Sequence, residues 1–239
     1  MTNRSFAYIH LNRQEGVVTT SGIAFGEFLA GLECKPANLL LLKGYCTPYD
    51  IPRHRELGLE HVSFKEIDRY IHQVDADFFW LDFQDEADLD RVTDQELAEL
   101  LYFGHKVKPL RRFQFEKLRN RYAYYSHDDD WYARIYMENP DDYRAVVACK
   151  LVKELKGRKR TMPLPPDEII DRLMGMFEQG AAIDFERADF ADGYAGVFIY
   201  PIGEHHDMDS IHGMLDRQRE ACGGEHLGYE TRGKRWRFY

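Results

Sequence analysis

Residues 203–212, GEHHDMDSIH, bring three histidines and three acidic residues into ten positions. If a helix begins near Asp207, then Asp209, His212 and Asp216 recur at i, i+3 and i+7 and lie along one stripe. Such a stripe could ligate a divalent metal such as zinc, manganese or iron. Acidic residues at a helix start also cap its free N–H groups, and the spacing matches no specific metal motif. We therefore expect capping and no cofactor, with a metal at Asp207, Asp209 and His212 as the alternative.

A second cluster, YYSHDDDW at residues 124–131, offers serine, histidine and aspartate side by side. Successive residues of a strand point to opposite faces, so Ser126, His127 and Asp128 cannot hydrogen-bond in series as a catalytic triad does. An acidic turn after a strand is the favoured interpretation. In the alternative, the site of a metal-dependent hydrolase or phosphoesterase is formed by His105, His127, Asp128, Asp207 and Asp209. The carboxylates hold the ion, and His105 or His127 moves a proton.

Charge is segregated in the middle of the chain. Residues 82–99 contain eight acids against one arginine, and residues 104–121 contain seven bases against one glutamate. The two blocks are expected to neutralise each other, within the fold or across a dimer. Aromatic side chains interrupt the basic block 106–122, a pattern that could also bind nucleotide or RNA. The ligand-binding candidates of that alternative are Arg111, Arg112, Arg119 and Tyr122.

Composition limits the classes of function. The 239 residues carry a formal net charge of −9, which disfavours nucleic acid and anionic membranes as partners without excluding a local basic site. A hydrophobic share of 44% is typical of a packed globular protein. No apolar run approaches the roughly 20 residues that span a bilayer, and the N-terminus lacks a secretory signal. The four cysteines form no C-x-x-C pair and are expected to be free thiols in a soluble, cytoplasmic protein.

Hydrophobic periodicity predicts interleaved helices and strands. A capping box formed by Thr93 and Glu96 predicts a helix start. A helix over 165–180 places four apolar residues on one face, Ile170, Leu173, Met174 and Phe177. The remaining predicted segments are strands at 6–11, 38–45, 77–83 and 121–127, helices at 139–157 and 208–221, a hairpin formed by 182–190 and 194–203, and a terminal strand pair at 225–231 and 234–239.

This irregular order favours an α+β fold over a strict βαβ repeat. We expect a mixed sheet with interleaved helices and with hairpins in the C-terminal third. One domain is expected over residues 1–239, with a subdivision at the basic, proline-containing connector 157–166 as the alternative.

Several segments together resemble one family of proteins. They are SGIAFGEFLAG, NLLLLKGY, FFWLDF, QELAELLYFGHKVKPL, RYAYYSHDDDWY and YPIGEHHDMD. In these blocks, which are spread over most of the chain, the sequence resembles a family of soluble bacterial proteins of unknown function that often carry the label "oxalate:formate antiporter". A transporter needs membrane spans that this chain lacks, so the label does not fit. The resemblance implies no activity and no catalytic residues.

The chain also departs from the pattern of that family. The family has variable or aromatic residues where this chain has His205 and His206, which implies that these histidines are incidental. The family tends to have glycine where this chain has Asp130, which puts a tight left-handed turn there in doubt.

The sequence as a whole favours a protein that acts by binding, as a non-enzymatic regulatory or accessory factor. A homo-oligomer or another protein is the expected partner. The competing classes are the metal-dependent hydrolase or phosphoesterase and the nucleotide- or RNA-binding protein described above.

Overall fold

The computed structural model divides the chain into two compact units. It describes residues 5–43, 59–63, 65–66, 78–96, 114–127, 132–156, 161–191 and 193–239. The first unit comprises Met1–Glu33 and Pro140–Tyr239, and the second comprises Cys34–Asn139. The second unit is therefore inserted between two segments of the first. Of the connector 157–166, residues 157–160 lie outside the described residues and 161–166 lie in the first unit. The single-domain organisation stays a prediction.

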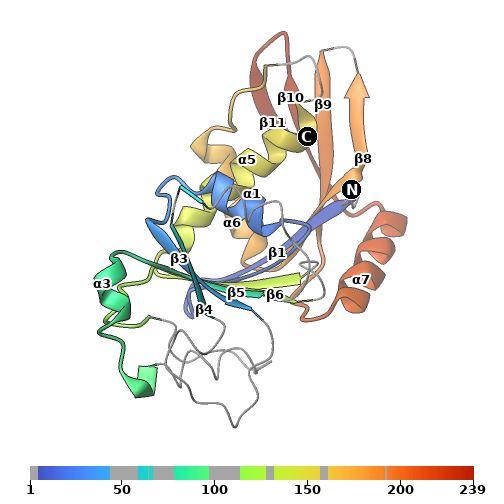
Figure 1. Cartoon of the computed structure of the whole chain (residues 1–239). Helices are drawn as coiled ribbons and strands as arrows, with labels where there is room; N and C mark the ends of the chain where they lie inside the picture. Colours follow the sequence, from blue (N-terminus) through green and yellow to red (C-terminus); the bar gives the residue numbers. More distant parts are fainter. Residues whose placement is uncertain are drawn as a thin grey trace. The chain divides into compact units, whose positions relative to one another are not determined.

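Six antiparallel strands form the sheet of the first unit among its described residues (Figure 1). Their order across the sheet is β11-β10-β9-β8-β1-β2. The strands are β1 Phe6–Asn12, β2 Val17–Ser21, β8 Ala181–Ala191, β9 Tyr194–Pro201, β10 Glu225–Glu230 and β11 Arg235–Phe238. The predicted hairpins of the C-terminal third, β8–β9 and β10–β11, are confirmed.

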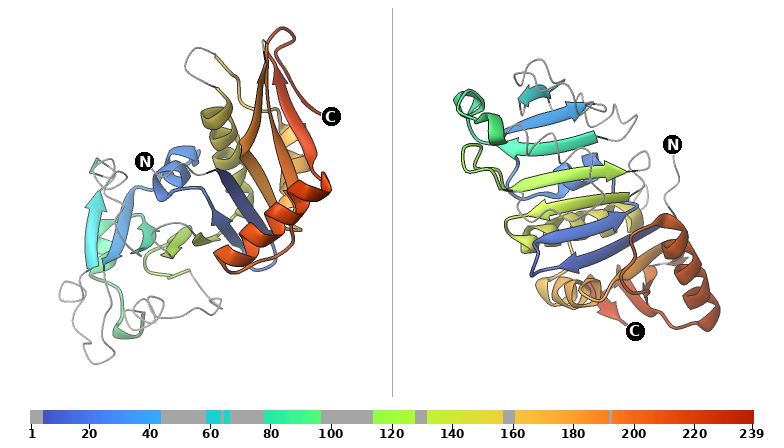
Figure 2. Two further views of the ribbon diagram at one scale, coloured as in Figure 1. Left: turned by 90° about the vertical axis from the view of Figure 1, so that its right-hand side faces the viewer. Right: turned by 90° about the horizontal axis from the view of Figure 1, so that it is seen from below.

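Helices pack on both faces of this sheet (Figure 2). They are α1 Phe25–Gly31, α5 Tyr143–Leu155, α6 Asp167–Phe177 and α7 Met208–Ala221, with the 3-10 helix η2 Pro140–Asp142 before α5. On α7, the ring of His212 makes an edge-to-face contact with the ring of Phe6 on β1. On α6, Arg172 lies over the ring of Phe238 on β11. Strand register places Phe6 and Phe238 on opposite faces, so α6 and α7 cover opposite sides of the sheet.

The core of the first unit follows the predicted periodicity. The four residues predicted on one face of α6 are all buried, and burial of each such side chain contributes about 1.5–3 kcal/mol. Gly31 allows α1 to approach α5 closely, because a Cβ there would lie 2.6 Å from the Cα of Val146. The helix predicted over 139–157 begins as the 3-10 turn η2, and its α-helical part starts at Tyr143.

A buried ion cluster joins α1 to α5. The Nζ of Lys150, a residue only 3% exposed, lies 2.9 Å from one carboxylate oxygen of Glu27, and the Nζ of Lys153 lies 2.6 Å from it. Burial alone would raise the pKa of Glu27. The two lysines and the backbone N–H of Ala24 outweigh burial and lower this pKa to about 2.

This pKa predicts how stability depends on pH. Because the pKa of Glu27 is lower in the folded chain than the value of 4.5 for the free side chain, its stabilisation is complete above that value and is lost as pH falls towards about 2. The loss amounts to about 3 kcal/mol. We expect urea unfolding of Glu27→Gln to show a shallower pH slope than wild type from roughly pH 5 to about pH 3. The exposed control Glu33→Gln should keep the wild-type slope, and equal slopes in all three proteins would contradict this account.

The sheet of the second unit contains five described strands. These are β3 Asn38–Lys43, β4 Leu59–Ser63, β5 Phe78–Phe83, β6 Tyr122–His127 and β7 Tyr132–Met137, and the short helix α3 Glu86–Leu89 follows β5. Their order is β7-β6-β5-β3-β4, and the neighbouring strands are antiparallel. The predicted capping box is confirmed, since the N–H of Thr93 donates to Glu96 at 2.8 Å and the N–H of Glu96 donates to the Thr93 hydroxyl at 3.2 Å. The α+β fold class is confirmed by both units.

No helix among the described residues combines the length and the apolar character needed to cross a membrane. Of the four cysteines, three lie in described parts of the chain, and all three are free thiols: Cys34, Cys149 and Cys222.

Candidate functional site

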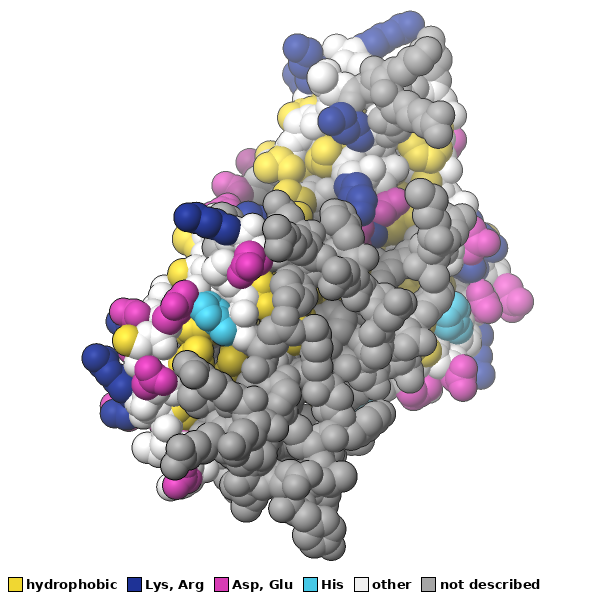
Figure 3. Space-filling model, viewed as in Figure 1, with side chains coloured by type: hydrophobic (Ala, Val, Ile, Leu, Met, Phe, Trp, Pro, Cys, Tyr) yellow, Lys and Arg dark blue, Asp and Glu magenta, His cyan; other side chains and the backbone are white. Residues whose placement is uncertain are grey.

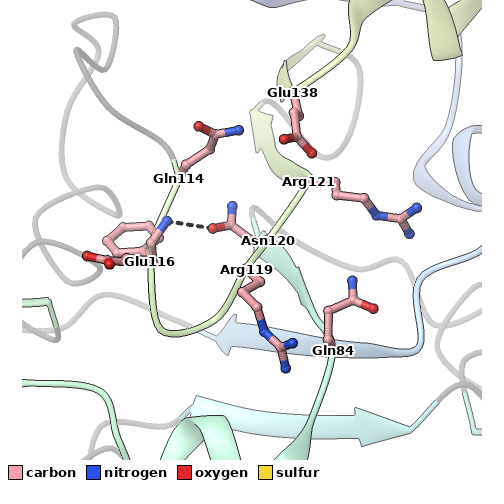
Figure 4. A pocket seen from close by; sticks show the side chains of 8 residues that line it. Gln84, Gln114, Glu116, Arg119, Asn120, Arg121 and Glu138 are labelled. Carbon is pink, nitrogen blue, oxygen red and sulfur yellow. Dashed lines mark hydrogen bonds between the residues drawn. The ribbon is translucent and has the colours of Figure 1, made fainter.

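A polar pocket of 590 Å³ lies in the second unit (Figure 4). Most of its lining comes from the turn at 114–121, which connects to β6. Gln84, directly after β5, and Glu138, directly after β7, complete it. The pocket therefore collects side chains from the ends of neighbouring strands.

Hydrogen bonds fix the shape of the turn at 114–121. The side chain of Asn120, a buried residue, accepts the N–H of Phe115 at 2.7 Å. The carbonyl of Phe115 accepts the N–H groups of Leu118 and Arg119 at 3.0 and 2.9 Å. Arg119 has a φ of 50°, a left-handed conformation that costs an ordinary residue about 1–2 kcal/mol. The buried side chains of Phe115 and Leu118 anchor the turn and offset this cost.

Asp82, buried on β5, positions Arg121. Its Oδ1 accepts the backbone N–H groups of Arg121 and Tyr122, each at 2.7 Å, and its Oδ2 lies 3.3 Å from Nε of Arg121. Burial raises the pKa of Asp82 although these hydrogen bonds lower it. The guanidinium of Arg121 also reaches the carbonyls of Cys34 and Lys35, at 3.5 and 3.4 Å. Arg121 is therefore held in one place on the pocket wall.

Asp88 positions the second arginine of the pocket. Asp88 is only 4% exposed, and its Oδ2 accepts a hydrogen bond from Arg119 at 2.6 Å. The guanidinium of Arg91 lies 3.5 Å from the other oxygen. The Arg119 side chain is itself 60% exposed. Its guanidinium can therefore contact a ligand while one of its N–H groups remains hydrogen-bonded to Asp88.

The lining balances its charges. Arg119 and Arg121, which are paired with Asp88 and Asp82, share the lining with the carboxylates of Glu116 and Glu138. Carboxamides come from Gln84, Gln114 and Asn120. Guanidinium groups bind carboxylates in a two-pronged geometry, and carboxylates accept hydrogen bonds from ammonium groups. The pocket thus offers complementary groups to a ligand that carries both charges.

The structure confirms the predicted neutralisation for two described bases of the basic block. Arg119 pairs with Asp88 and Arg121 with Asp82, so two of the bases meet acids of the block 82–99 within one unit. Arg111 and Arg112 lie outside the described residues. Tyr122 is 4% exposed, so a base could stack on its ring only if the surrounding side chains moved. Nucleotide or RNA binding by this block stays a prediction.

The cluster at 203–212 caps a helix. Asp207 is the N-cap of α7 and accepts the N–H and the hydroxyl of Ser210, each at 2.8 Å. Backbone N–H donation by Ser210 lowers the pKa of Asp207. Asp209 and His212 are exposed, and Asp216 pairs with Arg219 at 3.3 Å. The capping interpretation is confirmed, and the described parts of the chain contain no group of three or more potential metal ligands.

The structure describes part of the residue set of the hydrolase alternative, because Asp207 and Asp209 lie at the start of α7. His105 and Asp128 lie outside the described residues, and His127 is described only as the last residue of β6. The metal-dependent hydrolase therefore stays a prediction.

Sequence reasoning missed most of the pocket. Gln84, Glu116 and Glu138 belong to no recognisable motif. Asp82 enters the sequence analysis only as one of the eight acids in the block 82–99. One signal was present, because Asp82 interrupts the otherwise apolar run FFWLDF. A charged residue inside a buried strand needs polar partners, and here those partners are the residues that shape the site.

Comparison with known proteins gave no match, whether to a family model, a curated protein or a solved structure. The resemblance to the soluble bacterial family stays an expectation.

Proposed function

We propose that this protein is a non-enzymatic regulatory or accessory factor that binds a small zwitterionic molecule in the pocket of its second unit. A single observation supports this function. Two arginines held by buried aspartates line one pocket together with two glutamates and three carboxamides. We further propose that the protein acts in the bacterial cytoplasm and associates with itself or with another protein.

The charge balance of the lining favours a zwitterion over a simple anion. A lone phosphate would meet Glu116 and Glu138 as well as the arginines, and the like charges would repel it. A free amino acid or a peptide end instead places its carboxylate on Arg119 and its ammonium group near a glutamate. The fixed positions of Arg121 and Asn120 reduce the ordering cost of binding.

Calorimetric titration with a panel of L-amino acids tests this function. At least one amino acid should bind saturably, while acetate and methylamine, which each carry half of the charge pattern, should bind more weakly. Arg119→Gln should weaken binding about tenfold or more, because a charge-assisted hydrogen bond is lost. Lys117→Gln is the matched control, since Lys117 is exposed in the same turn and does not line the pocket. Equal affinities in both variants, or no saturable binding by any amino acid, would contradict the proposal.

A further inference from the structure

A row of rings lies on one face of the sheet of the first unit. Tyr194 and Phe198 on β9, His226 on β10 and Tyr239 at the end of the chain form this aromatic floor. The rings of Phe198 and His226 stack with centroids 4.6 Å apart, and the ring of Tyr239 lies 5.8 Å from His226 and 6.0 Å from Tyr194. The first three residues are half-buried, and Tyr239 is 59% exposed.

Two glycines let the ring of Tyr194 lie flat on the sheet. Gly196 and Gly228 are cross-strand partners, and a Cβ at either position would lie 2.4 or 2.1 Å from the Tyr194 hydroxyl oxygen. Side chains at these positions would therefore force the ring away from the backbone. The hydroxyl lies 3.2 Å from Nδ1 of His226, which holds the ring in place. Burial, together with the nearby carboxylates of Asp189 and Glu230, raises the pKa of Tyr194 to about 12, so the phenol is neutral at about pH 7.

Basic side chains border the aromatic floor. The last nine residues, TRGKRWRFY, contain four bases and no Asp or Glu, although the whole chain has a net charge of −9. Arg235 and Arg237 alternate with the buried Trp236, so they point to the same face as the floor, and Arg237 lies opposite Gly228. Figure 3 shows Lys and Arg side chains at the upper end of the view, where the β10–β11 hairpin lies in Figure 1.

We infer that the aromatic floor binds a short single-stranded nucleic acid, whose unpaired bases stack on the rings while Arg235 and Arg237 contact its phosphates. Base stacking on aromatic side chains needs rings on a rigid support, and the glycine pair holds the ring of Tyr194 flat on the sheet. Bases within a duplex are already stacked and cannot use the floor. An acidic peptide would satisfy the arginines but would leave the rings without a role. The overall negative charge confines binding to this local basic edge.

Fluorescence anisotropy of a labelled single strand of about eight nucleotides, as RNA and as DNA, tests this inference. Saturable binding should weaken about tenfold between about 50 and 200 mM salt, as a few phosphate contacts require. Tyr239→Ala should weaken it about tenfold, since one stacking partner is lost. Tyr239 is exposed, and its backbone N–H bond to His226 survives the substitution, so this variant should fold.

Further variants separate the contribution of the rings from that of the charges. Phe198→Leu, which keeps apolar volume, should weaken binding as Tyr239→Ala does. Arg235→Gln with Arg237→Gln should weaken binding about tenfold and reduce its salt dependence. Lys156→Gln is the control, because Lys156 is exposed at the end of α5 and far in sequence from the floor.

Three results would overturn the inference. They are no saturable binding of either strand, equal binding by the wild type and the Tyr239→Ala variant, and equally tight binding of polyphosphate, which has no bases. Tighter binding of RNA than DNA, or the reverse, would identify which strand is the ligand. The aromatic floor and the pocket lie in different units, so the two proposals can fail separately. The oligonucleotide can bind when no amino acid does, and an amino acid can bind when the oligonucleotide does not.

Discussion

Asp184→Ala should lower the free energy of unfolding by about 3–5 kcal/mol. Asp184 is fully buried on β8, and its two oxygens accept hydrogen bonds from Nε and a terminal nitrogen of Arg219 at 2.8 and 2.7 Å. One oxygen also accepts the backbone N–H groups of Glu186 and Arg187, at 3.2 and 3.3 Å, where the pairing of β8 with β9 is irregular. The substitution leaves all four donors without this acceptor. The guanidinium of Arg219, which is only 13% exposed, loses its buried partner and is left with the exposed carboxylates of Glu186 and Asp216.

Urea unfolding at neutral pH measures this loss. Asp189→Ala is the matched control, because Asp189 is an exposed aspartate on the same strand, and its loss should change stability by less than about 0.5 kcal/mol. Adding Arg219→Met to Asp184→Ala should recover part of the loss, since it removes a largely buried guanidinium that has lost its buried partner. Similar stabilities of the Asp184 and Asp189 variants would show that this ion pair does not hold α7 to the sheet.

Asp82→Ala should lower the stability of the second unit by about 3 kcal/mol and abolish ligand binding in the pocket. Without the carboxylate, the N–H groups of Arg121 and Tyr122 lose their acceptor, and the guanidinium of Arg121 loses its partner. Asp82→Asn should cost less, because its side-chain oxygen can still accept the two backbone N–H groups. Its amide nitrogen cannot accept from Arg121, so weaker binding should remain.

Paired urea unfolding and amino-acid titration check this prediction. Asp90→Ala is the control, because Asp90 is an exposed acid of the same block directly after α3 and does not line the pocket. If Asp82→Ala unfolds as readily as this control, or binds the amino acid with wild-type affinity, then Asp82 does not organise the site.

Local features of the fold could be predicted from the sequence. The buried face of α6, the capping box at Thr93, the N-cap at Asp207 and the β8–β9 hairpin each depend on residues that are near one another in the chain. Helix periodicity, capping and hairpin formation are local effects, so they can be read from short stretches. The order of the strands and the insertion of the second unit depend on long-range pairing, which no short stretch encodes.

The candidate site could be predicted only in part for the same reason. The segregated charges correctly indicated that acids and bases meet, but not which ones. Asp82 reaches Arg121 across 39 positions of sequence, and Asp88 reaches Arg119 across 31. Pairing of β5 with β6 brings the first pair together, and the left-handed turn at Arg119 directs the second. These effects are tertiary, and the aromatic floor depends likewise on the register between β9 and β10.

The most direct test of the proposed function is an NMR titration that observes the arginine side chains of ¹⁵N-labelled protein. The amino acid that binds most tightly in the calorimetric panel should shift the Nε–H signals of Arg119 and Arg121 and the carboxamide signals of Gln84, and all three should give one dissociation constant. The signal of Arg144, which pairs with Asp167 and Asp171 in the first unit, should stay in place. If the signals of Arg119 and Arg121 do not move while the ligand binds, then the pocket of the second unit is not the site of binding.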